Sequence, residues 1–292
     1  MSLITISNGS ITLTADSHGA VLSSVRKDGL EYLWQGDPAY WGFKDKNLFP
    51  YIGRLTDGKY TLSGKEYSLP LHGFATGAVF EVSYVDDTSV VFTLCEDEET
   101  LKMYPFPFVY VVKYEVAGSG FIKSCRVYNA GESEMYFALG SHPGFNVPLG
   151  NDGAFTDWYF SFDEPSSPVR IGFDDATCRL NDADTPYPLE SGTKLALRHD
   201  LFDRDAIVLK DMPRTVTLKS DSSTHSVRAA YPDMPFLGLW HMPKKDAPYV
   251  CIEPWVALPS HYNYVEDLAT QAHLIHLGAG EEYNNVITFT LT

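Results

Sequence analysis

The sequence has little cysteine and no cysteine arrangement typical of a metal site or a disulfide framework. Its four cysteines, at positions 95, 125, 178 and 251, form no CxxC pair and no Cys/His cluster with metal-ligand spacing. Cys125 and Cys251 lie in apolar, strand-like stretches and are interpreted as small core residues. No basic region followed by an apolar run opens the sequence, so a cytoplasmic protein with free thiols is expected.

Positive charge is also scarce. The 292 residues include 22 Lys and Arg but 38 Asp and Glu, which gives a formal net charge of −16. A field of this sign repels nucleic acid and anionic membrane surfaces. No stretch approaches about 18 consecutive apolar residues, which excludes a membrane-spanning helix. The expected partner is a small molecule rather than a nucleic acid or a membrane, and composition indicates no oligomeric state.

Several catalytic motifs are missing. The sequence contains no P-loop and no GxGxxG motif, so its glycines are assigned to turns rather than to a phosphate cradle. It also lacks the GxSxG motif that carries the nucleophilic serine in α/β-hydrolases. Nucleotide-dependent chemistry and hydrolysis by a nucleophilic serine are therefore not indicated.

What the sequence does contain is apolar/polar alternation with a period of two, from end to end. Clear examples are residues 10–14, 90–94, 112–116 and 287–291. Turn pairs such as Asn-Gly and Asp-Gly bound these runs. With 44% apolar and 14% aromatic residues, the pattern predicts one domain over residues 1–292, an all-β antiparallel sandwich.

Some segments receive more specific predictions. Residues 59–62 and 66–69 are expected to form a hairpin. Both ends of the chain are expected to be strands, which is consistent with their pairing in one sheet. Helical periodicity is nearly absent, and short helices are expected only at 98–104 and 264–271. Residues 34–54 are rich in aromatics but do not alternate, which predicts an ordered and functional loop.

The stretch Tyr249–Trp255 predicts a buried strand that ends on a carboxylate. A buried carboxylate is costly unless it is paired or hydrogen-bonded, so Glu253 is a candidate for chemistry. Pro254 has no N–H to donate, which predicts that the strand ends or bulges there. The competing interpretation is a Glu on an exposed edge.

Two histidines lie at predicted strand-to-loop junctions beside glycine: His72 in Leu-His-Gly-Phe and His142 in Ser-His-Pro-Gly-Phe-Asn. A glycine lets the backbone or a ligand approach the ring closely. Alternatively, each histidine caps its loop by bonding a carbonyl. Together with Glu253 they are chemically suited to zinc, but they lie far apart in the sequence and their spacing carries no information.

Two further charged residues are candidates. Arg54 follows the aromatic segment and could equally be a surface cation. Asp205 precedes an apolar strand, and on local grounds it is interpreted as a turn residue paired with Arg204.

Five stretches resemble the aldose 1-epimerase, or mutarotase, family, and especially its LacX-like branch. They occur in the family's order between about residue 30 and residue 260. The stretches are EYLWQGD (31–37), NLFPYIGR (47–54), LHGFA (71–75), GSHPGFN (140–146) and CIEPW (251–255). The resemblance implies a galactose-mutarotase-like β-sandwich, a sugar substrate and no cofactor or metal. Galactose mutarotases differ after the catalytic Glu, whereas the Pro-Trp found here is shared with the LacX-like branch.

Transferred through these motifs, Glu253 resembles the family's general base and His142 its general acid. His72 and Arg54 resemble residues that hold the sugar hydroxyls and ring oxygen, and Asp205 resembles a sugar-binding Asp. The implied reaction opens and recloses the ring of an aldohexose and so exchanges its α and β anomers. Each positioned acid or base typically contributes about 10²–10⁴ in rate.

Two expectations concern the site's surroundings. Glu253 and His142 should keep each other charged, because each ion favours the charged form of its neighbour. Trp34, Trp41 and Phe145 are candidates to stack on the apolar face of the sugar, with packing of the loop as the alternative for each.

Three other functions remain open. A hexose-6-phosphate mutarotase needs two or more converging cations, for which Arg54, Lys44 and Lys46 are available. A non-catalytic carbohydrate-binding sandwich would keep the aromatics without an acid/base pair. A glycoside hydrolase would use Glu253 and Asp205 as paired carboxylates.

Overall fold

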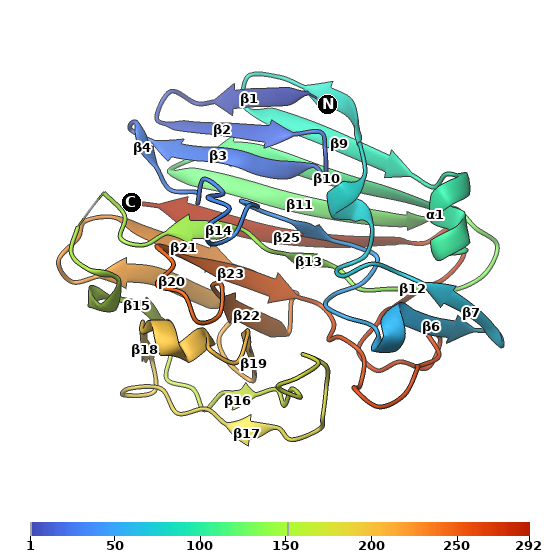
Figure 1. The fold of residues 1–292 in the computed structure, drawn as a ribbon. Coiled ribbons are helices and arrows are strands. Elements are labelled where there is room, and N and C mark those ends of the chain that lie inside the picture. Colours follow the sequence, from blue (N-terminus) through green and yellow to red (C-terminus); the bar gives the residue numbers. More distant parts are fainter. Residues whose placement is uncertain (1, 151) are drawn as a thin grey trace.

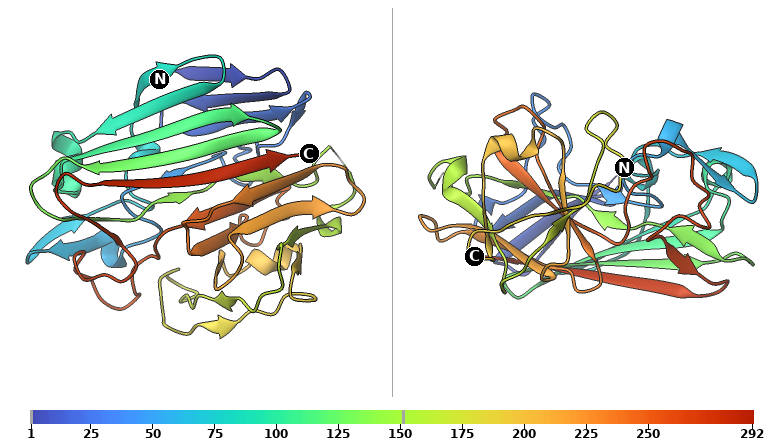
Figure 2. Two further views of the ribbon diagram at one scale, coloured as in Figure 1. Left: turned by 180° about the vertical axis from the view of Figure 1, so that it is seen from behind. Right: turned by 90° about the horizontal axis from the view of Figure 1, so that it is seen from below.

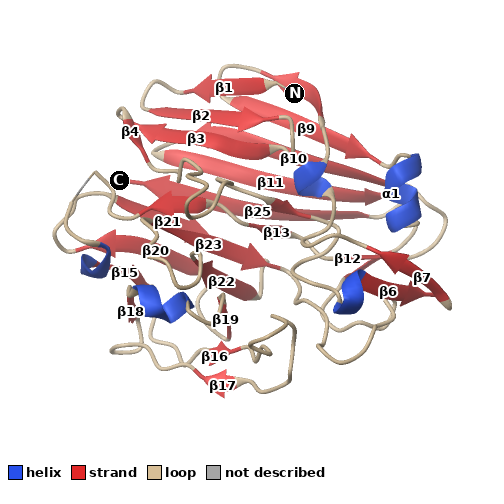
Figure 3. Ribbon diagram, viewed as in Figure 1, coloured by secondary structure: helices blue, strands red, loops and turns tan. Residues whose placement is uncertain are grey.

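The structure, a computed structural model, describes residues 2–150 and 152–292. Strands dominate it, and every pairing between named strands is antiparallel (Figure 3). Within the described residues the one α-helix is α1 (Glu98–Met103), which starts with a capping box between Asp97 and Thr100. Four 3₁₀ turns are also present: η1 (Thr56–Gly58), η2 (Ala75–Gly77), η3 (Phe155–Asp157) and η4 (His199–Phe202).

The larger layer is a nine-stranded sheet. In spatial order its strands are β18 (Lys194–Ala196), β15 (Trp158–Ser161), β20 (Thr215–Ser220), β21 (Ser226–Ala230), β25 (Glu282–Leu291), β11 (Gly120–Asn129), β10 (Phe108–Ala117), β9 (Ser89–Cys95) and β8 (Glu81–Val85). Figures 1 and 2 show the long strands of this sheet side by side as one continuous layer.

The second layer is an eight-stranded sheet whose strands are shorter and more interrupted. In spatial order they are β17 (Thr185–Pro186), β16 (Val169–Arg170), β19 (Ile207–Lys210), β22 (Phe236–Trp240), β23 (Tyr249–Trp255), β13 (Gly140–Ser141) and β5 (Asn47–Leu48), and β14 (Gly144–Asn146) also pairs with β23.

Smaller sheets complete the fold. They are the four-stranded sheet β1 (Leu3–Ser7), β2 (Ile11–Asp16), β3 (Val21–Lys27) and β4 (Leu30–Glu31), the hairpin β6 (Lys59–Leu62) and β7 (Lys65–Ser68), and the pair β12 (Met135–Phe137) and β24 (Ile275–Leu277). No helix in the described residues has the length and apolar character needed to cross a membrane.

Side chains from the two large sheets meet in a shared core. The ring of Phe145 on β14 lies 5.6 Å from that of Phe289 on β25, so the inner faces of the two layers touch. Lys123 on β11, which is 1% exposed, crosses the same space and donates to Ser141 Oγ on β13 at 2.7 Å. The molecule is therefore the antiparallel all-β sandwich that the alternation predicts.

Most local predictions are confirmed. Of the predicted strands, 90–94, 112–116 and 287–291 fall within β9, β10 and β25, and 10–14 falls within β2 except for its first residue. The predicted hairpin and first short helix are β6–β7 and α1. All four cysteines, which lie in the described part of the chain, are unpaired. Residues 34–54 form an irregular segment with one two-residue strand, β5.

Two local predictions are wrong. Residues 264–271 form turns rather than a helix, because their backbone bonds to the hairpin: Thr61 N–H donates to Glu266, and Leu268 N–H donates to Thr61. The terminal strands also lie in different sheets, since β1 pairs with β2 whereas β25 lies between β21 and β11.

Candidate active site

Strand β23 carries Glu253 and is buried along its whole length. Cys251 and Glu253 point to the face of the eight-stranded sheet that lies away from the sandwich core, whereas Ile252 between them packs into that core. The prediction that the strand ends or bulges at Pro254 is wrong, because β23 continues to Trp255.

Pro254 is tolerated because the neighbouring strand is itself interrupted. Gly140 of β13 lies opposite Trp255, and Gly144 of β14 lies opposite Cys251. Both pairings follow the same register, so His142, midway between them, falls opposite Glu253. The acid/base candidates are thus cross-strand neighbours, although they are far apart in the sequence.

Backbone bonding brings these two side chains together. Ile252 N–H donates to the carbonyl of Pro143 directly opposite, which makes that pair the hydrogen-bonded kind. The next pair, His142 and Glu253, is then the non-hydrogen-bonded kind, in which side chains lie closest. Pro143 and Pro254, on either side of it, have no N–H, so each of these flanking pairs can form only one of its two ladder bonds.

The same row of the sheet extends in both directions. On one side His142 N–H donates to the carbonyl of Lys46 at 3.1 Å, which places Lys46 next to His142. On the other side Gly238 of β22 lies opposite Glu253, and a Cβ at Gly238 would come within 3.1 Å of the Glu253 Cβ. The glycine therefore leaves room for the carboxylate within the sheet.

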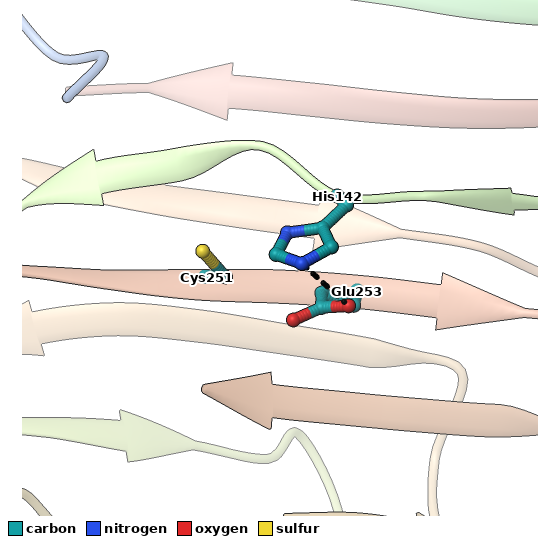
Figure 4. Close-up of side chains that lie close together, drawn as sticks. All are labelled: His142, Cys251 and Glu253. Carbon is teal, nitrogen blue, oxygen red and sulfur yellow. Dashed lines mark ion pairs between the residues drawn. The ribbon is translucent and has the colours of Figure 1, made fainter. Parts of the chain in front are cut away.

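His142 and Glu253 are close and almost fully buried. Nε2 of His142 lies 3.4 Å from Oε2 of Glu253. Figure 4 marks this contact with a dashed line. His142 is 6% exposed and Glu253 is 2% exposed. The separation is longer than a good N–H···O hydrogen bond of about 2.9–3.0 Å, so the two groups are in contact without being locked together.

Aromatic rings surround His142. Its ring stacks on Trp41 with centroids 5.0 Å apart and planes 19° apart, and Trp240 meets it edge-on at 5.6 Å. The ring of His72 also approaches edge-on, at 5.7 Å. Nδ1 of His142 is buried and has no hydrogen-bond partner among the described residues.

His72 is held by a turn in the left-handed region, with φ of 65°. Its Nδ1 accepts the N–H of Gly53 at 3.1 Å, so in the neutral ring the proton lies on Nε2, which can donate. Burial, Lys46 and Arg54 lower the pKa of His72 to about 3. Gly73 is required beside it, because a Cβ there would lie 2.3 Å from the carbonyl oxygen of Phe49.

These side chains line one cavity of about 310 Å³. All five residues proposed from the sequence are in its lining: Arg54, His72, His142, Asp205 and Glu253. The rest of the lining is Trp41, Phe43, Lys46, Gly53, Leu71, Phe173, Cys178, Arg204, Ala206, Val208, Trp240, Met242, Trp255 and Pro259. Their chemical roles stay predictions, but the structure does bring them together.

Asp205 does not pair with Arg204, so the local interpretation of this residue is wrong. Arg204 lies 3.6 Å from Asp175, whereas Asp205 adopts a left-handed conformation with φ of 73° and accepts the N–H of Ala206. The Cys178 thiol is its neighbour, and burial together with the bond to Asp205 raises the pKa of that thiol to about 12. A strained non-glycine residue at a cavity wall is typical of functional sites.

The expected mutual charging of Glu253 and His142 is wrong for this structure. Burial, and secondarily Asp205, raises the pKa of Glu253 well above its usual range. Burial, and secondarily His72 and Lys46, lowers the pKa of His142. Loss of hydration outweighs their attraction, so the neutral forms are favoured. The neutral pair and the ion pair hold the same number of protons and differ by one transfer between them.

Two of the three predicted stacking residues lie elsewhere. Trp34 packs on Tyr249 at 4.7 Å, and Phe145 is fully buried in the sandwich core. Trp41 does line the cavity, together with Trp240 and Trp255, which sequence reasoning missed. Pairing β22 with β23 as a hairpin, together with the alternation of side chains along each strand, would have placed Trp240 and Trp255 on the face that carries Glu253.

One group of potential metal ligands occurs in the described part of the chain. It comprises His142, Cys251 and Glu253, whose ligand atoms lie within 4.8 Å of one another. This group differs from the set of His72, His142 and Glu253 considered from the sequence. That the protein needs no metal or other cofactor stays a prediction.

Comparison with known proteins agrees with this fold. A family model described as aldose 1-epimerase matches residues 2–290. Protein LacX (chromosomal) of Lactococcus lactis subsp. lactis is 33% identical over 281 residues, covering 90% of this chain and 92% of LacX.

Two solved structures are similar over the whole chain. A galactose mutarotase related enzyme from Lactobacillus acidophilus has a TM-score of 0.94 at 34% identity, covering 100% of this chain and 97% of that one. A galactose mutarotase-like protein from Lactobacillus casei has a TM-score of 0.94 at 32% identity, covering 100% of both chains. On this evidence, the chain belongs to the aldose 1-epimerase family.

Proposed function

We propose that the protein is an aldose 1-epimerase that interconverts the α and β anomers of an aldohexose without a cofactor. The observation that carries the proposal is the contact between His142 Nε2 and Glu253 Oε2, 3.4 Å apart, on the floor of a cavity with His72 and Arg54 at its wall. A hemiacetal needs both an acid and a base, because neither the alkoxide nor the oxocarbenium ion is accessible near neutral pH.

In this mechanism Glu253 takes the proton of the C1 hydroxyl, and His142 gives a proton to the ring oxygen. The ring opens, the C1–C2 bond rotates, and reclosure from the other face reverses both transfers. His72, with its Nε2–H free to donate, and Arg54 hold sugar oxygens, and Asp205 accepts from a sugar hydroxyl.

Glu253 acts as a base only after its proton has moved. Burial favours the neutral pair, so a proton must pass from Glu253 to His142 when the sugar binds. A sugar oxygen that hydrogen-bonds to each group replaces part of its lost hydration and so favours the ion pair. Lys46, adjacent to His142, lowers the pKa of Glu253, which favours this transfer, but it lowers the pKa of His142 as well, which opposes it. The sugar oxygens are therefore the groups that must favour the ion pair.

The test is polarimetry on freshly dissolved α-anomers of several aldohexoses. Faster decay of optical rotation in the presence of the protein is the expected result. Sugar binding without faster decay would instead support a non-catalytic carbohydrate-binding protein, and reducing sugar released from a disaccharide would support a glycoside hydrolase.

A second candidate is a mutarotase for a hexose 6-phosphate, which one observation favours. Lys46, Arg54 and Arg204 all line the cavity of a protein with a net charge of −16. Neither Lys46 nor Arg54 takes part in an ion pair with a described residue. The Lys46 ammonium instead lies 4.0 Å from the centre of the Phe43 ring.

Two cations without carboxylate partners suit an anionic group on the substrate. Lys44 does not contribute, because its ammonium donates to Ser23 and Gln35 outside the cavity. Polarimetry with glucose and glucose 6-phosphate distinguishes the candidates. A phosphate substrate predicts a lower KM for the phosphorylated sugar, and Lys46→Met should remove that preference.

A further inference from the structure

Four rings form a column that ends at His142. Trp34 stacks on Tyr249 at 4.7 Å and 25°, and Tyr249 stacks on Trp41 at 5.8 Å and 22°. Trp41 then stacks on His142 at 5.0 Å and 19°. The column runs along the outer face of β23, and Trp34 Nε1 fastens it by donating to the carbonyl of Trp41 at 2.9 Å.

His142 lacks the contact that usually orients a functional histidine. In most such sites one ring nitrogen donates to a carbonyl or carboxylate, and this bond sets the ring plane. Here Nδ1 has no partner among the described residues, while Nε2 faces Glu253. The ring is therefore held by its faces and edges, with Trp41 flat against it and Trp240 edge-on.

We propose that Trp41 is a positioning residue for His142: its indole face fixes the plane of the imidazole and stabilises the imidazolium by a cation–π contact. The inference rests on the proposed role of His142 as the acid. A cation over an aromatic face is attracted by the ring quadrupole, most strongly by that of Trp, and the attraction strengthens when water is excluded. Trp41 thereby offsets part of the cost of charging a buried histidine.

Other groups also act on the charge of His142 and must stay unchanged in a test. The titratable and charged groups that face it are Glu253 and Cys251 on β23, Lys46 beside it in the sheet, His72 at the cavity wall and Lys123 from the opposite layer. None of them is altered by a substitution at Trp41.

The experiment compares Trp41→Phe with Trp41→Leu in the full-length protein. Both substitutions shorten the side chain and reduce its volume, but only Phe keeps an aromatic face. The pKa of His142 is read by ¹⁵N NMR of the imidazole, with its signal assigned by its loss in His142→Gln. We expect a pKa about 0.5 lower in the Leu variant than in the Phe variant. We also expect kcat about tenfold lower in the Leu variant with equal KM, since both variants present a similarly shortened wall to the sugar.

Trp34→Phe is a control for loosening of the column. It removes the bond to the Trp41 carbonyl but leaves Trp41 stacked between Tyr249 and His142, so the pKa of His142 should change less than in Trp41→Leu. Equal pKa values in the Trp41→Phe and Trp41→Leu variants would overturn the proposal, and so would a pKa in Trp34→Phe that falls as far as in Trp41→Leu.

Fluorinated tryptophan in the unmutated chain gives a second measurement that does not depend on a variant folding. Fluorine weakens the negative face of the indole at nearly constant size, so the pKa of His142 should fall stepwise as fluorines are added. An unchanged pKa would also overturn the proposal. If the wild-type protein shows no mutarotation, the proposed function fails, but the NMR comparison still decides the role of Trp41.

Discussion

Two of the contacts between histidine and glutamate in the described residues have their protonation set in opposite directions. His142 meets Glu253 at 3.4 Å on the cavity floor, and His261 meets Glu266 at 3.1 Å in the segment that follows β23. The pKa of His142 is lowered, whereas that of His261 is raised. The same pair of residue types is thus neutral in one place and favours charge in the other.

The difference comes from how many polar partners compensate for burial. Burial acts on His261 as well, but its ring bonds to Glu266 and to Asp182 at 3.0 Å, and together these outweigh burial. Glu266 also accepts the backbone N–H of His261. His142 has one acidic neighbour, Glu253, and aromatic rings elsewhere.

The comparison distinguishes a structural His–Glu contact, His261–Glu266, from the proposed catalytic one, His142–Glu253. His261 closes its own loop, whose Ser260 also bonds the carbonyl of Arg54, so that pair holds the wall of the cavity in place. A pair that is fully satisfied in the folded state gains nothing from a ligand. The His142–Glu253 pair is under-satisfied, and a sugar can supply what it lacks.

The largest expected effect is on activity when each glutamate is replaced by glutamine, which can neither take up nor release a proton. Glu253→Gln should abolish mutarotation, a loss of about 10³-fold or more, because the base is removed. The matched change Glu266→Gln should leave kcat within about threefold, since that carboxylate lies outside the cavity. Polarimetric rates of the two variants, with circular dichroism to verify folding, provide the measurement. Retained activity in Glu253→Gln would refute its assignment as the base.

Removal of each imidazole should give the next largest contrast. His142→Ala should lower kcat by at least about 10²-fold through loss of the acid. His261→Ala should act mainly on stability, with a smaller effect on kcat. A wild-type rate in His142→Ala would exclude this residue from the mechanism.

The two carboxylate variants should also differ in stability, and in opposite senses. Because the pKa of Glu253 is raised, the folded state holds a proton that the unfolded state releases, and stability falls as pH rises above the unfolded pKa of about 4.5. Glu253→Gln should therefore raise Tm near neutral pH, by about 2 °C or more. Glu266→Gln should lower the free energy of unfolding by about 1–3 kcal/mol, because bonds to His261 are lost. Thermal unfolding measures both effects. A change of Tm in the same direction in the two variants would contradict the proposed difference between the two glutamates.

The smallest effect is a pH dependence of opposite slope for the two histidines. The raised pKa of His261 contributes stability that is present below about pH 6.5 and is lost as pH rises through its folded pKa, so His261→Gln should cost more near pH 5.5 than near pH 8, by about 1 kcal/mol or less. The lowered pKa of His142 does the reverse, so His142→Gln should gain relative to wild type as the pH falls. The measurement is the free energy of unfolding from urea denaturation of both variants and the wild type at the two pH values. If the difference from wild type changed with pH in the same direction for both variants, the two histidines would not be set in opposite directions.

The sandwich and most of its strands could be predicted from alternation, because a strand with one buried face has an apolar residue at every second position. The turns at 264–271 could not be, because their backbone partner, Thr61, is distant in the sequence. Both ends were correctly expected as strands, but alternation does not specify which strand pairs with which. That residues 1–292 form a single domain stays a prediction.

The candidate site was identified through family motifs rather than through local pattern. Glu253 and His142 could be named, but their opposition across two strands depends on a register that no local feature encodes. Their protonation could not be foreseen either, because it depends on how completely Trp41 and Trp240 exclude water from His142. Arg54 and Asp205 reach the same cavity, although local sequence assigned both to the surface or to a turn.

The two prolines that flank the His142–Glu253 pair have a mechanical consequence. Pro143 accepts a bond from Ile252 N–H but cannot donate one in return, and Pro254 likewise offers Ser141 only a carbonyl. Each flanking pair can therefore form one ladder bond where two are usual. The stretch that holds His142 and Glu253 is thus joined more loosely than an ordinary antiparallel pair, so that small changes in strand separation meet less resistance as protons move and a sugar ring opens.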